Sequence, residues 1–523
     1  ALAAAAAVAL LRAPQALGAI HRYNGERFFE VGDAFIFRGG REGLVARSNA
    51  ADLADEEAAA TAATARVGRN VGNGNTFIRF SKVHFHRTQQ VANEYAAGRV
   101  TNGKQNYVGM VQAVVFEVGD RDRIGHVMPD GRTRRFCCTP TLQAQTGCEA
   151  DRLIVKERED EPGWPWVTEI FYEDNATVAY AVDDAVVIDS TGMYYLWFVV
   201  CDPNLAGVSI DGQTTWKNPT GYLPGMMAPN LDLFMWMSIA YGVLAAGWLL
   251  AYAVHWRHIM MLQHCISAVI FLSLVEMSAW YFDFEKFNMT GLRPEGVTVF
   301  AVLAGAARKS VSRLLVLVVS MGYGVVKPTL GGITQQVVSL TAVYAVATAL
   351  LDVMTNVGTV DDLDSSLRVI LVLPVAALDA VFILWIFTSL SRTLAQLQAR
   401  RQSAKLDMYR KFTNALALMV LFSIAFIVYE MMFKISDKYN ERWQEDWITT
   451  AYWHVLSFVL LLIICVLWMP REHSVKYAYH EDDVAEVWDE VDVITENFGD
   501  DTGKAIAADV FALEEEDGNA KLE

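Results

Sequence analysis

The sequence predicts an α+β membrane protein, in which a luminal antiparallel β-sandwich is followed by a bundle of seven transmembrane helices. Hydrophobic residues make up 53% of the 523 residues, which is high for a soluble chain, and they concentrate in apolar segments after residue 230. The preceding part instead alternates apolar and polar residues in short runs bounded by turn residues, as half-buried strands do. The chain therefore divides into a sheet domain and a helical domain.

The N-terminal part is interpreted in two steps. Residues 1–19 have the apolar core and small-residue end of a secretory signal peptide, although an alanine-rich tail is the alternative. Residues 20–225 form the predicted sandwich, with strands in 76–85, 107–118 and 192–201 and turns such as Pro129–Gly131. The low-complexity stretch from Ala50 to Ala65 is expected to be an insertion loop with a short exposed helix.

The helical domain is expected over residues 226–470. Its seven apolar segments are long enough to cross a bilayer at about 1.5 Å per residue. They cover residues 231–254, 260–281, 297–324, 333–354, 367–390, 412–432 and 448–469.

The third segment is unusual because it carries Arg308, Lys309 and Arg313 in its interior. Each basic residue would cost about 2.5–3.5 kcal/mol in the bilayer, so all three should face protein partners or a water-filled space. Helical spacing places Lys309 and Arg313 on one stripe with Ser320 and Lys327. Candidate counter-ions are Asp379 and Glu276 in neighbouring segments.

Depth along the helices selects between these acids. Counted from the predicted segment ends, Asp379 lies level with Arg308 and Lys309, whereas Glu276 is shallower. We therefore expect Asp379 to pair with Arg308 or Lys309, and Arg313 to face a cavity. Three interpretations stay open: ion pairs that fix helix packing, a headgroup site for a bound phospholipid, or a charged constriction in an ion path.

Orientation follows from the charges of the loops. The segment 391–411 carries six basic residues against Asp407, and short basic loops stay in the cytosol. The N-terminus is therefore predicted to be luminal and the C-terminus cytosolic. The glycosylation acceptors Asn175 and Asn288 both fall on the predicted luminal side.

Four of the six cysteines, Cys137, Cys138, Cys148 and Cys201, lie in the predicted luminal domain, where oxidation is expected. A bond between the vicinal pair is sterically the poorest, so Cys148 and Cys201 should each pair with one of the two vicinal cysteines. The two remaining cysteines lie in apolar segments and are expected to be free. A zinc site formed by Cys137, Cys138 and Cys148 is the disfavoured alternative, because their spacing matches no common metal module and the compartment is oxidising, so no metal site is predicted.

The acidic tail, residues 471–523, supplies most of the net charge of −17. Apolar residues recur at helical spacing in it, so a short amphipathic helix is expected there. Its acidity suits basic partners, either an adaptor protein or the basic segment 391–411, and a purely solvating tail is the alternative.

Several motifs of the helical part resemble one family. The run Gly322–Tyr323–Gly324 with Lys327–Pro328, and the segments 271–276, 290–296, 378–387 and 467–470, are similar to the lung seven-transmembrane receptor family, also called GOST proteins, and to its transmembrane protein 87 branch. The resemblance implies a Golgi-dynamics (GOLD) domain joined to seven helices with a cavity open to lipid. It also implies Golgi residence and a part in trafficking or in Golgi ion and pH balance.

Two other interpretations of these motifs are disfavoured. Gly322–Gly324 lacks the preceding residues of a potassium filter, and a glycine and proline after a helix favour a helix end. The Asp-Arg-Tyr and Asn-Pro-x-x-Tyr motifs of ordinary G-protein-coupled receptors are missing from the third and seventh segments.

The sequence therefore predicts a trafficking protein that binds lipid or cargo. The alternatives are a cation channel or regulator of Golgi ions and a signalling receptor. Partners are expected to be membrane lipids and cargo or adaptor proteins bound through the luminal domain and the tail, and no nucleic acid. The sequence shows no catalytic set of residues and no cofactor motif, so an enzyme is not expected. A bound phospholipid is the one small molecule that we expect.

Overall fold

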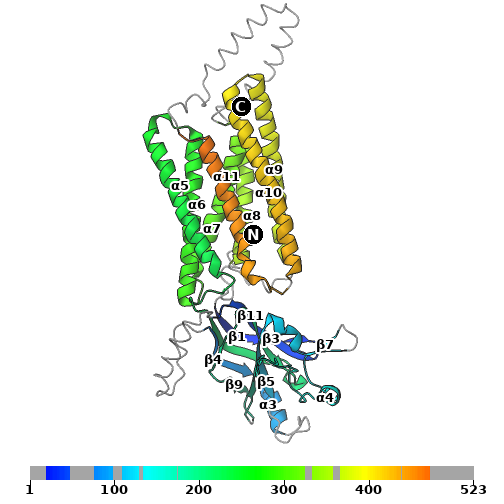
Figure 1. The fold of residues 1–523 in the computed structure, drawn as a ribbon. Coiled ribbons are helices and arrows are strands. Elements are labelled where there is room, and N and C mark those ends of the chain that lie inside the picture. Colours follow the sequence, from blue (N-terminus) through cyan, green and yellow to red (C-terminus); the bar gives the residue numbers. More distant parts are fainter. Residues whose placement is uncertain are drawn as a thin grey trace, which may run out of the picture.

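A computed structural model shows a β-sandwich at one end of a bundle of long helices (Figure 1). It describes residues 19–46, 76–97, 109–128, 133–173, 175–323, 333–356, 365–437 and 439–470. Residues 1–18 of the predicted signal-like segment, the insertion around 50–65, the turn at 129–131 and the acidic tail lie outside the described residues. The α+β membrane fold predicted from the sequence is confirmed.

The sandwich consists of two antiparallel five-stranded sheets. The first sheet has the order β1-β12-β4-β10, with β9 also paired to β4, and the second has the order β2-β3-β11-β5-β8. The first sheet contains β1 (Ile20–Arg27), β4 (Phe77–His86), β9 (Val178–Tyr180), β10 (Ala185–Val187) and β12 (Ser209–Lys217). The second contains β2 (Phe29–Val31), β3 (Ala34–Leu44), β5 (Met110–Glu117), β8 (Trp166–Phe171) and β11 (Gly192–Val200).

Aromatic side chains from both sheets fill the space between them. Phe198 on β11 meets Phe37 of β3 in its own sheet and Phe80 and Phe85 of β4 in the facing sheet, with ring centroids 5.4–6.4 Å apart. Such pairs stabilise a core beyond the burial of their surface. The alternation that predicted strands therefore reflects one face packed in this core.

Outside the sheets lie short elements. They are α3 (Gln89–Ala96), α4 (Pro140–Thr146) and the small ladder of β6 (His126–Val127) with β7 (Arg134–Arg135). Two disulfides tie this region together: Cys137 is bonded to Cys201, and Cys138 to Cys148. The expected pattern, in which each vicinal cysteine takes a distant partner, is confirmed, and Cys265 and Cys465 are free thiols.

Seven long helices follow the sandwich in the described residues. They are α5 (Ala228–Val254), α6 (Met261–Thr290), α7 (Glu295–Ser320), α8 (Thr334–Asn356), α9 (Ser365–Ala399), α10 (Ser403–Ser436) and α11 (Trp447–Leu467). Six of the seven include a segment long and apolar enough to cross a membrane; α7 is the exception, since it carries the three interior basic residues.

The helices differ from the predicted segments mainly at their ends. The second segment was expected to end at Tyr281, but α6 continues to Thr290 and reaches the sandwich. The expected loop 391–411 is mostly helix, because α9 continues to Ala399 and α10 begins at Ser403. Hydropathy marks only the apolar part of a helix, so polar turns beyond it are missed.

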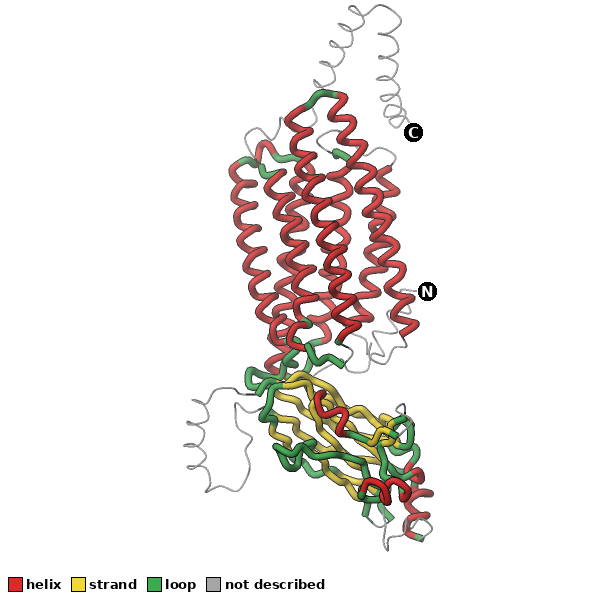
Figure 2. The backbone as a smooth tube through the Cα atoms, turned by 45° about the vertical axis from the view of Figure 1, so that its right-hand side comes forward, coloured by secondary structure: helices red, strands yellow, loops and turns green. Residues whose placement is uncertain are grey.

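Figure 2 shows the helices running side by side, with the sandwich beyond one end. In the bundle α7 contacts α6, α8 and α9, and α11 contacts α5 and α10. The turn between α10 and α11 lies against the sandwich, whereas the turn between α9 and α10 lies at the opposite end (Figure 1). This arrangement makes α7 the element through which interior charges can meet three neighbours.

Candidate functional site

The three interior basic residues of α7 each pair with an acid on a different helix. Arg308 pairs with Glu276 of α6, where Nε lies against Oε2 and Nη2 is 3.5 Å from Oε1. Lys309 Nζ is 2.8 Å from Asp352 Oδ2 of α8, and Arg313 Nη2 is 2.8 Å from Asp379 Oδ1 of α9. The basic stripe of α7 is therefore neutralised pair by pair.

The pair formed by Arg308 and Glu276 is closed. Only 7% of the Arg308 side chain and 2% of the Glu276 side chain are exposed. A glycine opposite makes this possible: a Cβ at Gly305 would lie 2.7 Å from Glu276 Oε1. A buried pair of this kind is costly to break, because the remaining charge has no partner.

The pair formed by Arg313 and Asp379 is open. The exposed fractions of their side chains are 39% and 30%. Asp379 Oδ1 makes no aligned hydrogen bond although the guanidinium is near. Arg313 can donate several hydrogen bonds, of which a single carboxylate oxygen uses few. Asp379 Oδ1 is itself buried, so the accessible part of this pair consists of its other polar atoms.

The predicted pairing was wrong in two respects. Asp379 contacts Arg313 rather than Arg308 or Lys309, and Arg313 is therefore not left without an acid. Glu276 is not shallow: at 1.5 Å per residue it lies about 21 Å from the end of α6 at Thr290, level with Arg308, about 20 Å from the start of α7. The misplacement of Glu276 came from ending the second helix too early.

The structure also places the other predicted residues. Ser320 is buried, donates its hydroxyl to Leu317 O at 2.7 Å, and accepts a bond from Thr393 Oγ1 on its carbonyl, so it does not line an open space. Gly322 has a positive φ of 81°, which suits the predicted helix end before Tyr323. Gly324, Lys327 and Pro328 lie outside the described residues.

Two charged features were missed by the sequence analysis. The first is Asp352, the partner of Lys309, which lies near the end of the apolar segment that follows α7. An acid in the next helix along the chain could have identified it as a candidate counter-ion. Asp283 of α6 is fully buried; it accepts from Arg293 Nε at 3.0 Å and from Thr298 Oγ1 at 2.5 Å. These bonds fix the turn between α6 and α7 at the sandwich end.

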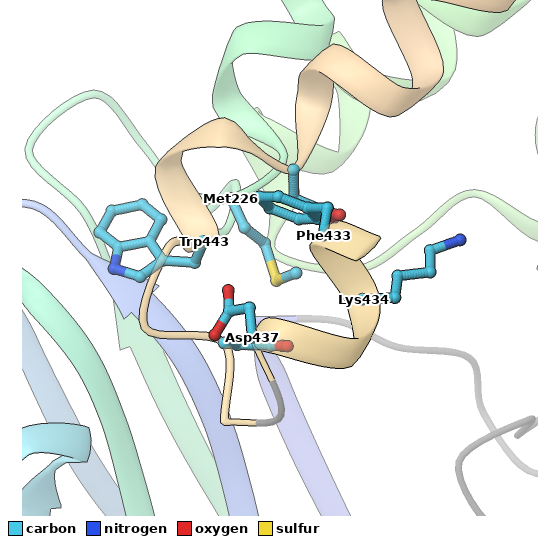
Figure 3. Close-up of a pocket in the computed structure, with 7 residues that line it drawn as sticks. Met226, Phe433, Lys434, Asp437 and Trp443 are labelled. Atoms are coloured by element: carbon cyan, nitrogen blue, oxygen red, sulfur yellow. The ribbon is translucent and has the colours of Figure 1, made fainter. Parts of the chain in front are cut away.

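The sandwich is joined to the bundle through Trp443, in the turn between α10 and α11. A Cβ at Gly43 of β3 would lie 2.6 Å from the Trp443 ring, and one at Gly225 would lie 2.9 Å from it, so two glycines make room for the indole. Beside it lies a pocket of about 320 Å³ that Met226, Phe433 and five other residues line (Figure 3).

Further bonds secure this joint. The Tyr195 hydroxyl of β11 donates to Tyr439 O at 3.1 Å, and burial raises the pKa of this phenol, which keeps it a donor. Asn288, near the end of α6, accepts from Leu223 N at 3.0 Å and donates from Nδ2 to Thr220 O at 3.2 Å. Nδ2 is also the atom that would carry a glycan, and modification of Asn288 stays a prediction. Asn175 is exposed.

Comparison with known proteins gives one family match, in the helical part. Residues 229–475 match the family described as "GOST, seven transmembrane domain". The chain is 36% identical to transmembrane protein 87B of Mus musculus over 263 residues, which cover 50% of this chain and 46% of that protein. It is 36% identical to transmembrane protein 87A of Homo sapiens over 264 residues, 50% of this chain and 47% of that protein.

A third relative extends into the sandwich. Membrane protein PTM1 of Saccharomyces cerevisiae is 24% identical over 394 residues, which cover 71% of this chain and 72% of that protein. The chain spans about half the length of the transmembrane protein 87 relatives it matches.

Proposed function

Because the seven-helix domain of this chain belongs to the GOST family, in its transmembrane protein 87 branch, we propose that the protein binds a membrane lipid inside its bundle and acts in membrane trafficking in the Golgi. The observation that carries this proposal is the open pair of Arg313 and Asp379. We propose a carrier or sorting protein rather than an enzyme.

The surroundings of Arg313 support a ligand. Arg313 lies on a helix of the bundle, and 39% of its side chain is accessible. We infer that this accessible part can reach a ligand within the membrane-spanning region. Charged residues at membrane depth are energetically costly. A charged side chain that stays accessible there is therefore a candidate for a functional site.

The chemistry of the pair fits a zwitterionic headgroup. A guanidinium binds phosphate oxygens through parallel N–H donors, and a carboxylate attracts an ammonium group. Arg313 and Asp379 present these two charges side by side on α7 and α9. A phosphatidylcholine or phosphatidylethanolamine headgroup carries the complementary phosphate and amine. The closed pair of Arg308 and Glu276 in the same bundle is too buried to bind a headgroup, and we assign it a structural role only.

The test compares two double variants of the full chain purified in mild detergent. Arg313→Ala with Asp379→Ala removes the open pair and leaves no unpaired charge, so folding should be kept. We expect it to retain several-fold less phospholipid than the unaltered protein, measured by native mass spectrometry. Lys309→Met with Asp352→Leu, which removes another pair of α7, is the matched control and should retain lipid normally.

Equal lipid retention by the Arg313/Asp379 variant and the unaltered protein would show that no headgroup is held there. Equal loss in both double variants would point to general loosening of the bundle and would also contradict the proposal. Thermal unfolding of each variant identifies such loosening directly.

The orientation is a second part of the proposal, with the sandwich in the lumen and the C-terminus in the cytosol. It places the sandwich where luminal cargo could bind and the acidic tail where an adaptor could bind. Endoglycosidase should increase the mobility of the protein from cells, and changing both acceptors, Asn175→Gln with Asn288→Gln, should abolish the shift. Labelling of the sandwich by a cytosolic reagent in intact vesicles would overturn this orientation.

A further inference from the structure

Two histidines and an aspartate meet on the outer face of the first sheet. His84 and His86 are alternate residues of β4, so both side chains leave the same face of the sheet. Val83, before them, and Phe85, between them, point the other way and are buried in the core. Asp211 of β12 lies directly opposite His84 in the strand register. Sheet geometry thus brings three metal-ligating side chains together.

The three side chains are close enough to share one ion. One ligand atom from each lies within 4.8 Å of the others. His86 Nε2 is 3.4 Å from Asp211 Oδ2, and the two imidazole centroids are 4.9 Å apart. Two ligands held about 2.0–2.1 Å from a tetrahedral zinc ion are themselves about 3.3 Å apart, which matches the separation of His86 and Asp211.

Outer contacts orient two of the ligands. His84 Nδ1 lies 2.9 Å from Lys82 O; donation to this carbonyl leaves the Nε2 lone pair free. Asp211 Oδ1 accepts from Gly25 N at 2.8 Å, which leaves Oδ2 for the ion. Metal-binding histidines and carboxylates are held in this way by second contacts.

A bulge beside the cluster sets the direction of these side chains. The pairing of β4 with β12 shifts register between Asp211 and Gln213, where Lys82 has a positive φ of 51°. Gly212 (φ 126°) is needed there, since a Cβ on it would lie 2.5 Å from Lys82 O. Bulges commonly redirect side chains next to binding sites.

We propose that His84, His86 and Asp211 bind a divalent transition-metal ion of the zinc class, with water at the open coordination position. Two imidazoles and one carboxylate suit zinc and its late first-row neighbours rather than Ca²⁺ or Mg²⁺, which prefer oxygen ligands. The side chains of His86 and Asp211 are 41% and 32% exposed, so an ion can enter without opening the sandwich. This proposal departs from the sequence-based expectation that the chain holds no metal site.

The test uses Zn²⁺ alone and the full chain, purified without a histidine tag and treated with EDTA. Isothermal titration should show one Zn²⁺ bound per chain, and Co²⁺ in its place should give the visible absorption of a low-symmetry site. His84→Ala or His86→Ala should weaken Zn²⁺ binding by at least about tenfold, and the double variant should abolish this binding. Asp211→Asn, which keeps the bond from Gly25, should weaken it less.

His126→Gln is the matched control, because His126 lies on β6, outside the cluster. It should bind Zn²⁺ like the unaltered chain. Unfolding midpoints measured in EDTA should agree among all variants, whereas Zn²⁺ should raise the midpoint most where the three ligands are intact and not at all in the double histidine variant. Unchanged Zn²⁺ affinity in the His84→Ala/His86→Ala variant, or no binding by the unaltered chain, would overturn the proposal. Neither result bears on lipid retention at Arg313.

Discussion

Replacing Arg308 by methionine alone is expected to destabilise the protein by about 3–5 kcal/mol, because Glu276 would be left as a buried charge without its partner. Glu276→Gln alone should be comparably harmful, since it strands the guanidinium. The double variant Arg308→Met with Glu276→Leu should recover much of the loss, because no charge then needs a partner. Reversible unfolding in mixed micelles measures all three free energies.

A surface pair provides the control for this experiment. Lys411 and Asp407 are 66% and 63% exposed on α10, and Lys411→Met should change the unfolding free energy by less than about 1 kcal/mol. If Arg308→Met lowered the free energy of unfolding as little as Lys411→Met does, Glu276 would be reached by water, and the pair would not be part of a closed core. If the double variant were as unstable as each single one, packing rather than charge would hold α6 against α7.

The second large effect is expected from the disulfides of the sandwich. Removing the Cys137–Cys201 bond by replacing both cysteines with alanine should destabilise the protein by about 4 kcal/mol, because the bond closes a loop with a sequence separation of 64. Removing Cys138–Cys148, with a separation of 10, should cost about 3 kcal/mol. Denaturant unfolding of both double variants, followed by tryptophan fluorescence, gives the comparison.

Thiol counting checks the same arrangement. The unreduced, denatured protein should show only the two thiols of Cys265 and Cys465. Four or more reactive thiols would contradict the pairing, and a larger loss of stability from the shorter loop would contradict the entropic account of these bonds.

Much of the architecture could be read directly from the sequence. Alternation of apolar and polar residues in β4 predicts a strand because a sheet residue points to one face or the other, and β11 is predicted by its continuous run of aromatic and β-branched residues. Long apolar runs predict spanning helices because a backbone in lipid must satisfy its own hydrogen bonds. Vicinal cysteines predict distant partners because a bond between neighbours is strained. Each of these signals is local, so no knowledge of other elements is needed.

The candidate site was only half predictable. The basic residues of α7 could be identified as interior charges from their place in an apolar segment. Their partners could not, because pairing depends on where α6 ends and on how the helices are offset. Extending α6 from Tyr281 to Thr290 moved Glu276 level with Arg308, its partner in the structure. Residue counting along α9 does not predict the pairing of Asp379 with Arg313, which depends on how the two helices pack. Hydropathy carries no information about such polar helical turns.

The sequence by itself thus determined which segments are strands and helices, which residues are charged at membrane depth, and which cysteines can be bonded. Only the tertiary structure decided which side chains meet. His84 and His86 are two apart in sequence and share a face in any strand, but Asp211 joins them only through the register of β12 and its bulge. Arg313 is open and Arg308 closed because different helices cover them. Contacts between distant segments depend on packing geometry, and local periodicity does not encode it.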